Sequence, residues 1–118
     1  GRKDDNLVLR KSMDFAVRIV RLYKYLSIEK RESVLSMQLL RCGTSIGANL
    51  HEAQEAVSTK EFSAKVYIAL KEARETEYWL MLLYKTDYLQ QAEYDSLNRD
   101  CTELLKLLVS ITKTLRGQ

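Results

Sequence analysis

The sequence predicts an all-α fold, an antiparallel up-down-up-down four-helix bundle. The 118 residues include no proline and only four glycines, so tight turns and many short strands are disfavoured. Apolar residues recur at intervals of three and four along four long segments, as on one side of a helix. Short polar stretches separate these segments, and short connections favour antiparallel neighbours. A chain of this length is accounted for by one domain, residues 1–118.

The first two helices are expected at about residues 6–27 and 33–57. One side of the first helix carries the apolar residues Val8, Phe15, Ile19, Leu22 and Leu26. In the second helix the spacing between successive small or apolar residues alternates between four and three positions, through Leu39, Gly43, Ile46, Leu50, Ala53 and Val57. Ser33 follows a polar stretch and is a favourable N-cap residue, so we expect the second helix to begin there.

The third and fourth helices are expected at about residues 59–86 and 91–116. Ser58 and Glu61 form the S-x-x-E pattern of a capping box, which predicts a helix start directly after Ser58. Gly117 is a residue type favoured just past a helix end, which predicts where the fourth helix stops. The fourth apolar stripe consists of Tyr94, Leu97, Cys101, Leu104, Leu108, Ile111 and Leu115.

The first two helices carry more apolar surface than a monomeric bundle needs. Gly43 and Gly47 are four residues apart, and each weakens a helix by roughly 0.8–1 kcal/mol relative to alanine. That cost indicates close backbone approach, either within the bundle or between subunits. Because the first helix has a second apolar stripe as well, we predict a closed homo-oligomer. Its expected interface residues are Val20, Tyr23, Leu40, Thr44 and Gly47.

No pattern of catalytic, metal-ligating or cofactor-binding residues is visible. His51 is the only histidine, and the sequence H-E-A-Q-E that it begins lacks the second histidine of the zinc-protease motif H-E-x-x-H. No nucleophile motif and no glycine-rich phosphate loop accompany it. We therefore expect a protein that is not an enzyme, with no catalytic residues, no metal site and no cofactor.

Cysteine usage and hydropathy bear on the compartment. Cys42 and Cys101 are too few for a disulfide scaffold, and this favours a reducing compartment such as the cytoplasm. No apolar run approaches the roughly 18–20 residues that cross a bilayer, so we expect a soluble protein without a membrane partner.

The net charge of +3 is unevenly distributed, since residues 1–31 hold nine Lys or Arg against four Asp or Glu. Arg10, Arg18, Arg21 and Lys24 are expected on the outward face of the first helix, opposite its apolar stripes. Such a basic face can bind the phosphates of RNA, with Arg18 and Arg21 as first contacts. The alternative is an ordinary solvated helix face.

Two segments carry a family resemblance. Residues 39–50, LLRCGTSIGANL, and residues 69–80, ALKEARETEYWL, resemble the four-helix-bundle proteins encoded in 23S rRNA intervening sequences. The resemblance extends from Phe15 to about Leu108. The sequence departs from the family pattern at Cys42, where serine is frequent, and at His51, where a small or apolar residue is frequent.

The resemblance implies an architecture and possible partners. Related accessory proteins of diversity-generating retroelements assemble as barrel-like homopentamers whose basic surface engages nucleic acid and a reverse transcriptase. We therefore expect a pentamer associated with RNA or another nucleic acid. The alternative is a protein-interaction scaffold that binds a polymerase or reverse-transcriptase-like partner with no direct RNA contact. The link to ribosomal RNA is the location of the genes, and fold similarity does not transfer function.

Overall fold

Four α-helices account for most of residues 2–117, the part of the chain that the computed structural model describes, with side chains described from residue 6. The helices are α1 (Arg2–Ile28), α2 (Val34–Ala53), α3 (Thr59–Lys85) and α4 (Gln91–Leu115). The α1 helix starts four residues before the predicted position, and the bounds of α3 and α4 lie within one residue of those predicted. The all-α fold predicted from the sequence is confirmed.

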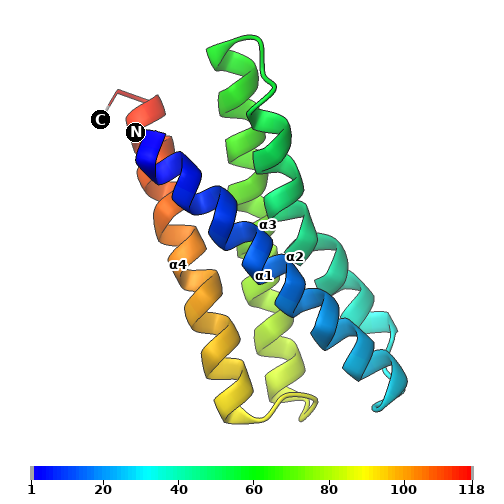
Figure 1. The fold of residues 1–118 in the computed structure, drawn as a ribbon. Coiled ribbons are helices and arrows are strands. Elements are labelled where there is room, and N and C mark those ends of the chain that lie inside the picture. Colours follow the sequence, from blue (N-terminus) through cyan, green and yellow to red (C-terminus); the bar gives the residue numbers. More distant parts are fainter. Residues whose placement is uncertain (1, 118) are drawn as a thin grey trace.

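The helices pack in an up-down-up-down order. Each helix packs on the next one along the chain, and α1 also contacts α4. Figure 1 shows α1 crossing the other helices obliquely, with its N-terminal end beside the C-terminal end of α4. The bundle is elongated, 44 Å in its longest dimension.

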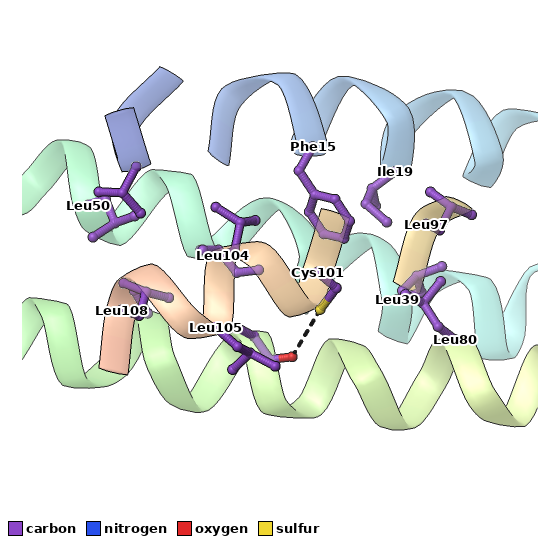
Figure 2. Close-up of a cluster of buried hydrophobic side chains, with 14 of the residues drawn as sticks. Phe15, Ile19, Leu39, Leu50, Leu80, Leu97, Cys101, Leu104, Leu105 and Leu108 are labelled. Atoms are coloured by element: carbon purple, nitrogen blue, oxygen red, sulfur yellow. Dashed lines mark hydrogen bonds between the residues drawn. The ribbon is translucent and has the colours of Figure 1, made fainter. Parts of the chain in front are cut away.

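Side chains from all four helices form one core. The apolar stripes predicted from the sequence are buried almost throughout, and Figure 2 shows Phe15 and Ile19 of α1 pointing toward the other helices, among their leucines. Fully burying one such side chain stabilises the fold by about 1.5–3 kcal/mol. The thiol of Cys101 lies among them and donates to the carbonyl oxygen of Ala73 at 3.5 Å. This single core holds the outer faces of the helices in fixed positions.

The start of α3 is capped as the sequence predicts. The Ser58 hydroxyl accepts a hydrogen bond from the N–H of Glu61 at 3.1 Å, and Ser58 has the extended backbone typical of an N-cap. The Glu61 carboxylate accepts a hydrogen bond from the N–H of Val57 at 3.4 Å, one residue before the Ser58 N–H that a capping box would use.

The α2 helix is shorter than predicted, since it ends at Ala53 and not at residue 57. The N–H groups of the next three residues bond to carbonyl oxygens three positions back, at 3.0–3.2 Å, which tightens the chain out of α-helical geometry. Ser58 also needs an extended backbone, which a helix continued through Val57 could not supply. The prediction that Val57 belongs to the core was wrong, because its side chain is 92% exposed.

The α2 helix begins where expected, but with a different cap. Ser33 occupies the N-cap position without making a side-chain capping bond. The buried carboxylate of Glu32 accepts from the N–H groups of Val34, Leu35 and Ser36 at 3.0, 2.9 and 2.8 Å. A charged side chain at this end also interacts favourably with the helix dipole.

The two glycines of α2 face α1 of the same chain. A β-carbon at Gly43 would lie 2.9 Å from both γ-carbons of Ile19, and one at Gly47 would lie 3.2 Å from the Ser12 hydroxyl oxygen. The close approach inferred from the sequence therefore lies within the bundle. Gly47 is buried against its own α1, so it has no surface left for the subunit contact predicted for it.

Candidate nucleic-acid interface

The basic residues predicted on α1 fall into two groups. Arg10, Arg21 and Lys24 are exposed to solvent. Within residues 6–117, none of these three side chains forms an ion pair. Among the side chains described for α1, from residue 6 onward, they are therefore the exposed cations that an external phosphate can reach.

Arg18 is placed differently from the prediction. Its guanidinium forms an ion pair with Asp100 at 2.6 Å and donates to the Ser96 hydroxyl at 3.0 Å, both on α4. Successive residues are about 100° apart around a helix, so the side chain of Arg18 points in a different direction from those of the three exposed cations. It points toward α4. The expectation that Arg18 lies on the outward face was wrong, because it lies at the contact between α1 and α4.

A pocket of about 290 Å³ opens between α1 and α4 beside these residues. Its lining residues are Arg18, Arg21, Leu22, Tyr25, Glu93 and Leu97. Tyr25 is 42% exposed, and the Lys30 ammonium lies 5.8 Å from the centre of its ring. An aromatic ring beside an arginine can stack a nucleobase while the guanidinium holds a phosphate.

Sequence reasoning missed Tyr25 as part of this site. The signal was present, since Arg21 and Tyr25 are four residues apart and neighbouring positions on a helix surface. What could not be read from the sequence is the contribution of α4, whose Leu97 and Glu93 close the pocket from the other side.

Comparison with known proteins identifies the family. A model of the 23S rRNA-intervening sequence protein family matches residues 4–110. The chain belongs to this family. No curated protein matches the chain.

A solved structure supports the same assignment. The solved chain is a protein with unknown function from the S23 ribosomal protein family of Bacteroides thetaiotaomicron VPI-5482. The two chains are 57% identical, and the match covers 93% of this chain and 98% of that chain with a TM-score of 0.92. Family and fold are thus established together.

This intervening-sequence family protein also has an apolar face on α1 and α2. Met13, Val17 and Val20 follow one another along α1, and Met37 lies on α2, all exposed. Three predicted interface residues, Tyr23, Leu40 and Thr44, are half-buried on the same two helices. The exposed surface of α1 therefore carries both apolar residues and the basic residues Arg10, Arg21 and Lys24.

Both cysteines and two glutamates are engaged within the fold. Burial raises the pKa of the Cys42 thiol to about 11 and that of Cys101 to about 12, so both stay protonated at neutral pH. Glu72 and Glu75 both bind Arg41. Among the described residues, no group of three or more His, Cys, Asp or Glu is placed to hold a metal ion.

Hydropathy gives one further result. In the part of the chain that the structure describes, no helix combines the length and the apolar character needed to cross a membrane.

Proposed function

We propose that this intervening-sequence family protein is a non-enzymatic homo-oligomer that associates with RNA through the basic face of α1. The observation that carries the proposal is the set of three exposed cations, Arg10, Arg21 and Lys24, none of them in an ion pair within residues 6–117. Exposed lysine and arginine side chains bind phosphates and release counterions, which gives sequence-independent affinity. The two buried free thiols fit a reducing compartment, and we place the protein in the cytoplasm.

The pocket between α1 and α4 favours an unpaired nucleotide over a duplex. In a duplex the faces of the bases are stacked on one another, so they cannot contact the Tyr25 ring. An unpaired base can stack on Tyr25 while its phosphate binds Arg21, which lines the same pocket. Arg18 is held in place at this edge by Asp100. We therefore propose single-stranded or looped RNA as the partner.

Assembly would multiply this basic face. The apolar face of α1 and α2 is the proposed subunit contact, and the basic residues of α1 lie beside it. Around a closed ring the cations of successive protomers would form a continuous belt. On the family resemblance we propose five protomers.

A fluorescence-anisotropy titration with a structured rRNA-like hairpin, at two salt concentrations, tests the proposal. The variant is Arg10→Ala with Arg21→Ala, because Arg18 is already paired with Asp100. We expect weaker binding and a salt slope lowered by about one for each phosphate contact removed. Tyr25→Ala should weaken binding by about 1–3 kcal/mol, and Tyr25→Phe should not.

The matched control is Lys60→Ala with Lys71→Ala, which changes the charge equally at two exposed positions of α3. RNA affinity that is the same in both double variants and the unaltered protein would overturn the proposal. The scaffold that binds a polymerase-like protein without RNA would then take its place. A protein partner of that kind should remain bound after nuclease treatment and in high salt.

A further inference from the structure

A second basic surface lies between α3 and α4, on the side of α4 turned away from α1. There a groove of about 440 Å³ is lined by three cationic side chains, Arg74, Lys106 and Lys113. All three are exposed, and within residues 6–117 none of them forms an ion pair. Glu77 is the one carboxylate in the lining, so the groove has an excess of positive charge.

The floor of this groove is apolar. Leu105 and Val109 line it one helical turn apart on α4, and Val109 lies between Lys106 and Lys113 in the sequence. None of the lining residues is aromatic, so the groove offers no surface on which a nucleobase could stack. A phosphate backbone would neutralise the cations and leave the floor uncovered. The groove therefore fits a ligand that is acidic along one edge and apolar along another.

The spacing of the cations points to a helix. Lys106 and Lys113 are seven residues apart, which places them about 10.5 Å apart along α4. A second helix lying in the groove has the same rise per residue, so acidic residues one heptad apart would reach both lysines. Apolar residues three and four positions from each acid would cover Leu105 and Val109.

We propose that the α3–α4 groove binds an acidic amphipathic helix of a partner protein. This goes beyond the RNA association proposed for α1, since it uses other helices and a ligand of another class. The apolar floor supplies affinity through buried area, and the cations select an acidic partner and orient it. Glu77 repels an acid at its end of the groove, which limits the registers that the bound helix can adopt.

The experiment uses labelled synthetic helical peptides of about 18 residues with heptad-spaced glutamates beside a leucine stripe, in a set that covers the registers. We expect saturable binding that Lys106→Glu with Lys113→Glu weakens by about tenfold or more. The matched control, Lys24→Glu with Lys30→Glu, introduces the same charge at exposed positions in and beside α1, away from the groove, and should leave binding unchanged. Val109→Thr keeps the side-chain shape and should weaken binding about fourfold through the lost apolar contact.

Three results with the peptides would overturn the proposal. The first is that no peptide of the set binds. The second is that a peptide of the same composition in scrambled order binds as tightly as the amphipathic peptides. The third is that the control variant weakens binding as much as the groove variant does. Displacement of the peptide by oligouridylate, with the same loss in the groove variant, would assign the groove to nucleic acid and also overturn it. The Arg10→Ala and Arg21→Ala variant should bind the peptide normally, so failure here is distinguishable from failure of the RNA proposal.

Discussion

Single residues decide where the helices of this protein begin, and Glu32 shows how. Burial by itself raises the pKa of the Glu32 carboxyl, but hydrogen bonds from the N–H groups of Leu35, Ser36 and Val34 outweigh it, and the pKa lies below its ordinary value. The ionised form is thus the one that the folded state stabilises. The sequence pointed to Ser33 because serine is the commoner cap, and nothing local indicated that a buried glutamate would replace it.

Glu32→Gln should lower the free energy of unfolding at neutral pH by about 1–2 kcal/mol, because the amide replaces one charged acceptor oxygen with a donor. A depressed pKa stabilises the fold fully above the unfolded glutamate pKa of about 4.3, and this contribution is lost as the pH falls through the folded value. The difference between variant and unaltered protein in urea denaturation should therefore shrink in acid. Glu29→Gln, at an exposed position nearby, should have little effect at either pH. A difference that stays constant down to low pH would argue against this role.

At the scale of elements, the helices were predictable because the apolar period of three and four residues runs through each of them. The end of α2 was not predictable in this way. The apolar period continues to Val57, but the cap of α3 requires an extended Ser58 and shortens the helix before it. The end of α2 is thus set by competition between α2 and the cap of α3. The apolar pattern along α2 alone does not predict this boundary.

The contact between α1 and α2 gives a test at this scale. Gly43→Ala should lower the free energy of unfolding by about 1 kcal/mol, although alanine favours helices, because both γ-carbons of Ile19 lie 2.9 Å from the new β-carbon. Both carbons are attached to a β-branched centre and cannot rotate away together. Gly47→Ala meets only the Ser12 hydroxyl at 3.2 Å and should be close to neutral. Chemical denaturation compares them, and a Gly43→Ala protein more stable than the parent would contradict the close contact.

For the whole molecule, the charge pattern on α1 was visible in the sequence, whereas the site that it forms was not. Three of the four predicted basic residues are exposed, but Arg18 is drawn into an ion pair with Asp100, 82 positions away. The same contact between α1 and α4 creates the pocket that contains Tyr25. Partners so distant along the chain are set by how the helices pack, and the period of one helix carries no information about them.

The exposed apolar residues of α1 lead to a test of assembly. Val20 is 37% exposed at the proposed subunit contact, and Ile68 on α3 is 40% exposed outside it. Val20→Glu should therefore cost the protomer little stability, but a closed ring would bury one unpaired carboxylate at every interface.

We expect light scattering to give an oligomer for the parent and for Ile68→Glu, and a protomer mass for Val20→Glu, with similar thermal unfolding of the two variants. Val20→Glu should also weaken RNA binding, because the belt of cations is broken into single faces that bind without avidity, and because the new carboxylate lies four residues before Lys24 and can pair with it. A parent protein that is monomeric at micromolar concentration would remove both expectations. If a monomeric Val20→Glu protein bound RNA as tightly as the parent, the basic face of a single protomer would be sufficient for binding. The proposed belt of cations around the ring would then be wrong.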